Sequence, residues 1–189
     1  MFRKKKLMIN MSKMEKTIIY FKNYGPENTN DVIKAVYERI KEKDINTVIV
    51  ASTSGETGLK FAKALKDVAK VVAVSYEKMN PNFKEEIIKL GGIAIDETHL
   101  PLHEKGMDNI RNAFYTLGQG FKVAIEVILI AADEKVINLY EDVIGVGGTD
   151  RGADTAIVAR STTTKEIFSK DKNKKLEVRE IIAMPLKKM

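Results

Sequence analysis

Two short segments of the 189-residue chain combine glycine with hydroxyl side chains, and each follows a run of apolar residues. The first, residues 52–58, lies between an apolar β-branched run and an amphipathic run that predicts a helix. Backbone N–H groups at the start of a helix, together with the helix dipole, attract anions, and Gly55 permits a close approach to the backbone. We therefore predict a phosphate site whose contacts come from Ser52, Thr53, Ser54, Gly55, Glu56 and Thr57.

The second segment, residues 147–155, follows another apolar run and contributes glycines, hydroxyl groups and a guanidinium suited to bidentate contact with phosphate. Lys122 could also reach a phosphate, although a solvated lysine is the alternative. Asp154 stands where a strand should begin, so its carboxylate is expected to orient the loop or Arg151 rather than take part in chemistry. The ligand-binding residues predicted from this part of the chain are Lys122, Gly147, Gly148, Thr149, Arg151 and Asp154.

Both segments also have structural interpretations, which the sequence leaves open. Thr53 and Glu56 match a capping box, in which the threonine hydroxyl and the glutamate carboxylate would occupy the N–H groups that an anion needs. Residues 147–154 could be a plain turn between two strands. Neither segment is a Walker A motif, because no Gly-Lys-Ser/Thr follows, and Asp150 stands where the dinucleotide-binding fingerprint requires glycine.

No catalytic residue and no metal site is predicted. The chain has no cysteine and two histidines, His99 and His103, whose i,i+4 spacing is interrupted by Pro101. No Ser/His/Asp arrangement is recognisable and no general base stands out, so the sequence leaves open whether the protein is an enzyme. Glu126 lies within an apolar helical run, where an unpaired carboxylate is costly. It could bind ligand, pair with Lys122 four residues earlier, or face solvent.

The periodicity of the remaining sequence predicts how these residues are positioned. Short apolar runs alternate with amphipathic runs, which indicates a mostly parallel sheet covered by helices on both faces. We predict an α/β fold of three layers, α/β/α, with a mostly parallel, mixed sheet of five or more strands. Helices are expected after Thr29, a candidate N-cap, after residue 55, from Pro81 to the glycines at 91 and 92, and over 108–117 and 120–136, with a loop at 96–107. Strands are expected at 17–21, 46–51, 70–75, 93–95, 143–146, 155–159 and 176–184.

The patterns of charge and hydropathy define one domain and exclude some partners. The formal net charge is +6, but residues 1–16 carry +5 and residues 165–189 carry +4, so the body of the chain is −3. Proteins that bind nucleic acid carry basic residues on a folded face, so no nucleic-acid partner is expected. No apolar run reaches the ~18 residues needed to span a bilayer and no signal peptide is recognisable, so we expect a cytoplasmic protein without a membrane partner. Residues 17–189 are predicted to form a single α/β domain and residues 1–16 a basic N-terminal extension, with disorder as one interpretation of it.

Three runs of the sequence, residues 47–57, 71–75 and 143–149, resemble the C-terminal domain of pyruvate kinase. They are a strand entering a turn of Ser, Thr and Gly, an apolar strand ending in Val-Ser, and a later strand followed by a glycine-rich loop. In allosteric pyruvate kinases the two loops together hold the phosphates of the effector. The resemblance therefore implies a fold of that type and a phosphorylated small molecule as partner. The catalytic barrel of pyruvate kinase is absent, so kinase activity is not implied.

The span from about residue 17 to residue 185 is more similar still to a group of small stand-alone archaeal proteins with this fold, for which flavin mononucleotide (FMN) is the implied ligand and cofactor. The sequence departs from these patterns at Glu56, where pyruvate kinase usually has a basic or neutral residue, and in the loop 96–107, which is shorter than expected. A carboxylate at 56 would repel a sugar bisphosphate, but it could accept hydrogen bonds from the ribityl hydroxyls of FMN. Besides a protein that only binds FMN, two other functions remain open. One is a flavin-dependent oxidoreductase, in which the flavin does the chemistry, and the other is a structural homo-oligomer without ligand. The similarity to the stand-alone archaeal group is carried by residues 28–29, 52–57, 119–123, 126, 131–133, 147–149 and 152–156.

Overall fold

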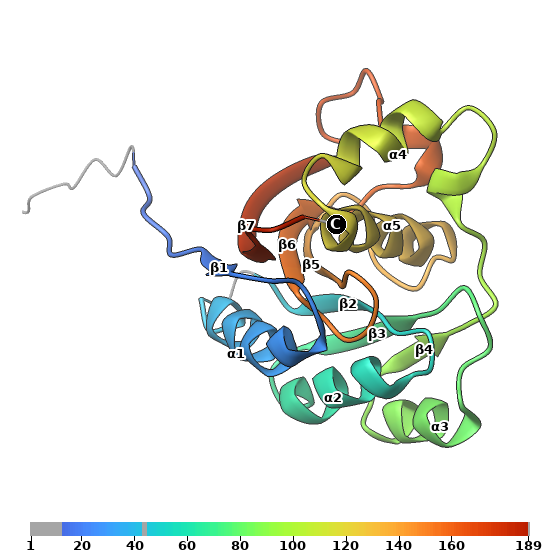
Figure 1. The fold of residues 1–189 in the computed structure, drawn as a ribbon. Helices are drawn as coiled ribbons and strands as arrows, with labels where there is room; N and C mark the ends of the chain where they lie inside the picture. Colours follow the sequence, from blue (N-terminus) through green and yellow to red (C-terminus); the bar gives the residue numbers. More distant parts are fainter. Residues whose placement is uncertain (1–12, 43–44, 189) are drawn as a thin grey trace, which may run out of the picture.

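The computed structural model describes residues 13–42 and 45–188 of the chain. Most of the predicted N-terminal extension, residues 1–12, lies outside the described residues. The rest of the chain forms one sheet with helices on both faces, as Figure 1 shows. Within the described residues, none of the helices combines the length and apolar character needed to cross a membrane.

Over the described residues the sheet has seven strands in the order β1-β7-β6-β5-β2-β3-β4. Strand β6 runs antiparallel to its two neighbours, and all other neighbouring pairs are parallel. The prediction of a mostly parallel, mixed sheet of five or more strands is therefore confirmed. The strands are β1 (Ile19–Phe21), β2 (Thr47–Ala51), β3 (Lys70–Val74), β4 (Ile93–Ile95), β5 (Asp142–Gly147), β6 (Thr155–Arg160) and β7 (Glu177–Pro185).

The helices form the two outer layers. One face of the sheet carries α1 (Thr29–Ile40), α2 (Glu56–Leu65) and α3 (Pro81–Lys89), and the other carries α4 (Asp108–Tyr115) and α5 (Gln119–Asp133), as seen in Figure 1. Three single 3₁₀ turns complete the structure: η1 (Pro26–Asn28), η2 (Pro101–His103) and η3 (Thr164–Glu166). The α/β/α layering predicted from the alternation of strands and helices is present.

Alternate side chains of the central strands fill two separate cores. Val48 and Val50 of β2 pack with the layer of α1, α2 and α3, whereas Ile49 packs with α5. All three are fully buried. A strand buried on both faces must be apolar at every position, which explains why continuous β-branched runs mark the central parallel strands.

Helix α5 lies unusually close to β5 because glycines face it. A Cβ atom built on Gly147 would overlap the carbonyl oxygen of Gly120 and lie 2.7 Å from the Ala124 nitrogen. A Cβ on Gly145 would overlap the Ala124 carbonyl oxygen in the same way. Gly147 was predicted to belong to a ligand-binding loop, but it is the last residue of β5 and its missing side chain makes room for α5.

The sequence predicted Thr29 as an N-cap, and this prediction is wrong. Thr29 is the first residue of α1, and Asn28 occupies the cap position without a side-chain hydrogen bond to the helix. The Thr29 hydroxyl instead donates to the Pro26 carbonyl oxygen at 2.7 Å and accepts from the Ala153 N–H at 3.0 Å. Thr29 therefore attaches α1 to the loop between β5 and β6, a contact that local sequence could not reveal.

Candidate functional site

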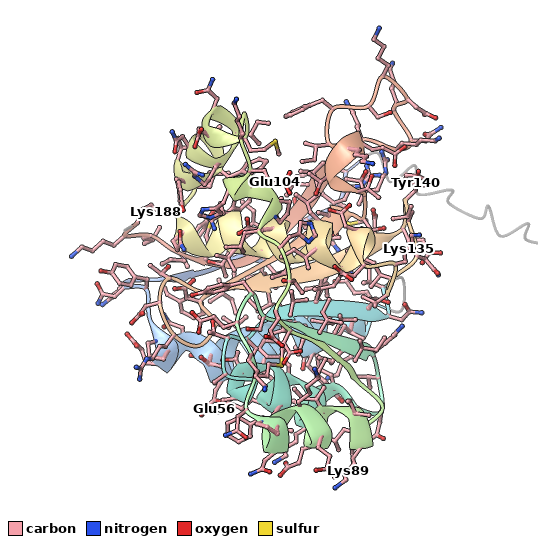
Figure 2. All side chains as sticks on the ribbon, turned by 90° about the vertical axis from the view of Figure 1, so that its right-hand side faces the viewer. Glu56, Lys89, Glu104, Lys135, Tyr140 and Lys188 are labelled. Carbon is pink, nitrogen blue, oxygen red and sulfur yellow. The ribbon has the colours of Figure 1, made fainter. Side chains whose placement is uncertain are left out.

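A cleft of about 920 Å³ opens at the carboxyl ends of the parallel strands. Figure 2 shows Glu56 and Lys188 on this side of the molecule, with Lys135 and Tyr140 at the opposite edge. Both segments singled out in the sequence line the cleft, although they are far apart in the chain. The lining residues among those predicted are Ser52, Thr53, Ser54, Glu56, Thr57, Lys122, Gly148 and Arg151.

The carbonyl oxygens of the first segment are engaged by protein groups. The Ser52 oxygen accepts from the Gly55 N–H at 3.1 Å, and the Thr53 oxygen accepts from the Ser75 hydroxyl at 3.0 Å. The Ser54 oxygen accepts from the Asn80 N–H at 3.0 Å. These bonds attach the segment to the loop that follows β3 and fix the orientation of its peptide groups.

Three N–H groups of the same segment have no partner among the described residues, whereas those of Ser52, Gly55, Glu56 and Gly58 donate within the protein. Within the described part of the chain, the N–H groups of Thr53, Ser54 and Thr57 have no hydrogen-bond acceptor. The side chains of Thr53 and Ser54 are exposed at the mouth of the cleft. Unengaged N–H groups beside the first turn of a helix, next to engaged carbonyls, form a concave surface that suits an anion.

The capping-box alternative for this segment is wrong. Helix α2 begins at Glu56 with Gly55 at the cap position, where φ is 93°. The hydroxyls that accept from its first turn are those of Ser54, from the Glu56 N–H at 3.3 Å, and Ser52, from the Gly58 N–H at 2.9 Å, and not that of Thr53. Glu56 is therefore too early in the helix to reach back as a capping box requires, and its carboxylate pairs with Lys60 at 2.8 Å. The hydrogen bond from Lys60 lowers the pKa of Glu56, and the charge of Arg151 lowers it further. Gly55 itself faces α3, because a Cβ there would lie 2.9 Å from the Phe83 Cβ.

The second segment has an exposed part and a buried part. Gly148, Arg151 and Gly152 line the cleft, whereas Thr149 and Asp154 lie beneath it. A Cβ on Gly148 would overlap the carbonyl oxygen of Gly152, so the turn itself requires that glycine. Gly148 is thus explained by the shape of the turn, and the cleft-facing contribution of the segment comes from its backbone and from the side chains of Asp150 and Arg151.

Asp154 holds the second segment in shape. Its side chain is fully buried and accepts hydrogen bonds from the N–H groups of Thr149 at 3.0 Å and Gly25 at 3.3 Å, and from the Thr155 hydroxyl at 2.8 Å. A carboxylate with three donors is satisfied by the protein, and because Asp154 is fully buried it presents no surface to a ligand. Its geometry is that of the orienting role predicted for the loop.

The wall of the cleft formed by α5 contains a buried ion pair. Lys122 Nζ lies 2.8 Å from Glu126 Oε2, and each side chain is only 4% exposed. Of the alternatives that the sequence left for Glu126, pairing with Lys122 is the one observed. His103 and Tyr115 also line this part of the cleft, and neither was predicted to do so. They come from η2 and α4, whose sequences carry no pattern that points to a site.

The two histidines lie in different places. His99 Nε2 lies 3.3 Å from Asp133 Oδ2, whereas His103 Nε2 lies 3.3 Å from Lys122 Nζ. No group of three or more acidic or histidine side chains suited to a metal ion occurs among residues 13–42 and 45–188.

The charges that line the cleft are nearly balanced. Lys78, Lys122 and Arg151 face four carboxylates, those of Glu56, Glu77, Glu126 and Asp150. The Lys122–Glu126 pair neutralises itself, so the attraction for an anion must come mainly from backbone N–H groups and Arg151. Such a site favours a single phosphate group over several.

Comparison with known proteins adds little to this geometry. No family model matches the chain. Among solved structures, a crystal structure of O-ureido-L-serine synthase is similar over 59% of this chain, with a TM-score of 0.32 and 18% sequence identity. The match spans 40% of that protein. A similarity this low carries no functional argument.

Proposed function

We propose that the cleft binds a phosphate-bearing small molecule at the carboxyl edge of the sheet. The phosphate would be held by the free N–H groups of Thr53, Ser54 and Thr57 around the start of α2, and residues 148–152 would close over it. The observation that carries the proposal is that both segments line one cleft while the carbonyls of the first are engaged elsewhere. Ligands of open α/β sheets bind at this edge as a rule.

FMN is the ligand we propose, from the resemblance of the sequence to the stand-alone archaeal group and to the C-terminal domain of pyruvate kinase, whose fold we propose for this chain. FMN has one phosphate, which suits the nearly balanced charge of the cleft. Its flat ring system would lie against Leu100, Tyr115 and Val123, which line the wall formed by η2, α4 and α5. A cleft of about 920 Å³ is large enough for a ligand of this size.

The proposal is tested by titrating the purified protein with FMN, riboflavin and inorganic phosphate while following flavin fluorescence and competition. We expect FMN to bind, riboflavin to bind at least ~10-fold more weakly because it lacks the phosphate, and phosphate to compete. The variant Thr57→Asp should abolish FMN binding, because a carboxylate would stand beside the N–H groups that hold the phosphate.

Ala64→Asp is the matched control. It adds the same charge to an exposed position of the same helix, two turns away from the cleft. We expect its affinity for FMN to equal that of the wild type. Equal binding of FMN by both aspartate variants, or equal binding of FMN and riboflavin by the wild type, would place the ligand elsewhere.

A further inference from the structure

A cluster of four side chains forms the wall of the cleft opposite the start of α2. Lys122 and Glu126 project from successive turns of α5, His103 comes from η2 and Tyr115 from the end of α4. All four line the cleft. The proposed phosphate site does not use them, yet burying an ion pair at the wall of a cleft is costly unless its geometry is well satisfied.

Both carboxylate oxygens of Glu126 accept hydrogen bonds within the protein. Its Oε2 accepts from Lys122 Nζ at 2.8 Å, and its Oε1 accepts from the Leu102 N–H at 3.1 Å. The carboxylate thus joins α5 to η2 and holds the Lys122 side chain in place. Because the carboxylate contacts both η2 and the Lys122 ammonium, we assign Glu126 as a positioning residue for Lys122.

Lys122 retains one hydrogen-bond donor. An ammonium group has three N–H bonds and no lone pair, so a hydrogen bond to His103 Nε2, 3.3 Å away, is one that Lys122 donates to the tautomer with an unprotonated Nε2. Glu126 accepts the second N–H bond, and within the described residues no third acceptor is present. The ammonium also lies 5.6 Å from the centroid of the Tyr115 ring, which is an attraction to the ring face. A buried donor without an acceptor at the wall of a cleft is a site for an acceptor on the ligand.

We propose that Lys122 determines ligand specificity by donating its remaining N–H to a carbonyl-type oxygen of the bound molecule. The inference rests on the proposed function and adds a second point of recognition to the phosphate site. The ligand class becomes a phosphate monoester whose other end carries an amide, imide or carboxylate oxygen. Phosphate esters with only alkyl or hydroxyl groups lack that acceptor and bind through the phosphate alone.

The experiment uses the double variant Lys122→Met/Glu126→Gln, because either single substitution leaves a buried charge without its partner. The glutamine keeps an oxygen for the Leu102 N–H, and urea unfolding checks that the variant folds. Probes are FMN, whose ring carries carbonyl oxygens, and two compounds without any, inorganic phosphate and glycerol 3-phosphate. The control is Glu85→Gln/Lys89→Met, which removes an exposed ion pair at the same spacing on α3.

We expect the double variant to bind FMN at least ~10-fold more weakly, since a hydrogen bond to a charged group is lost, and to bind the other two probes within 2-fold of the wild type. The α3 control should bind all three unchanged. FMN binding as tight as in the wild type would overturn the inference and leave the proposed function standing. Equal weakening for all three probes would also overturn it, because Lys122 would then be a phosphate contact. A wild-type protein that binds none of the probes would refute the proposed function and the inference with it.

Discussion

Breaking the Lys122–Glu126 pair should destabilise the protein far more than removing both charges together. At 2.8 Å and an effective dielectric constant of 20, two unit charges attract by about 6 kcal/mol. The cost of burying the two charges offsets most of that attraction, so the intact pair adds little net stability. A single substitution keeps the burial cost of the remaining charge and loses the attraction. Lys122→Met and Glu126→Gln should therefore each lower the free energy of unfolding by about 3–5 kcal/mol.

The double variant should lie within about 1 kcal/mol of the wild type, because no buried charge remains. Urea unfolding at pH 7, followed by far-ultraviolet circular dichroism, measures both quantities. With a slope of about 2.5 kcal/mol per molar urea, the midpoint of each single variant should fall by about 1–2 M while the slope stays constant. Two results would contradict this expectation: a loss of less than about 1 kcal/mol in the free energy of unfolding of each single variant, or a double variant as unstable as either single one. The first result would show that water reaches the pair, and the second that the two side chains stabilise the protein by packing rather than through the balance of their charges.

Two further predictions concern the framework around the cleft. Gly147→Ala should lower the free energy of unfolding by about 1–3 kcal/mol, because its Cβ would lie 2.7 Å from the Ala124 nitrogen and force α5 away from β5. An unchanged urea midpoint would contradict this packing argument. The hydrogen bond from Lys84 lowers the pKa of Asp96, and the Met79 N–H lowers it further. A lowered pKa in the folded state stabilises the protein above the unfolded value of about 3.9, and this contribution is lost as the pH falls. Asp96→Asn should therefore be less stable than the wild type at pH 7, with the difference shrinking between pH 5 and pH 3; a difference independent of pH would show that the charge of Asp96 plays no part.

The sequence predicted the identity of the strands better than their arrangement. The buried strands β2, β3 and β5 are continuous apolar runs because both of their faces are covered, and such runs are visible in local sequence. The place of β6, antiparallel between β5 and β7, depends on pairings between residues far apart in the chain. Periodicity contains no information about such pairings, so the order of the strands could not be predicted.

The candidate site was predictable where one short segment determines it. Residues 52–57 could be singled out because a strand end and a helix start adjoin them in the sequence. The choice between anion site and capping box could not be made, since it depends on whether the helix begins at residue 54 or, as observed, at Glu56. The sequence could not identify His103 and Tyr115 as site residues, because they approach Lys122 only when η2, α4 and α5 pack together.

Gly147 acts on the cleft through packing, whereas Gly148 and Gly152 of the second segment line the cleft directly. Gly145 and Gly147 allow the backbone of α5 to lie close to that of β5, and this approach fixes the first turns of α5 at the carboxyl ends of the parallel strands. Lys122 lies in that part of the helix, so its position depends on the glycines of β5. A side chain at either glycine would push the first turns of α5, and the Lys122 ammonium with them, away from β5. The glycines of β5 therefore set the depth at which α5 presents Lys122 to the cleft.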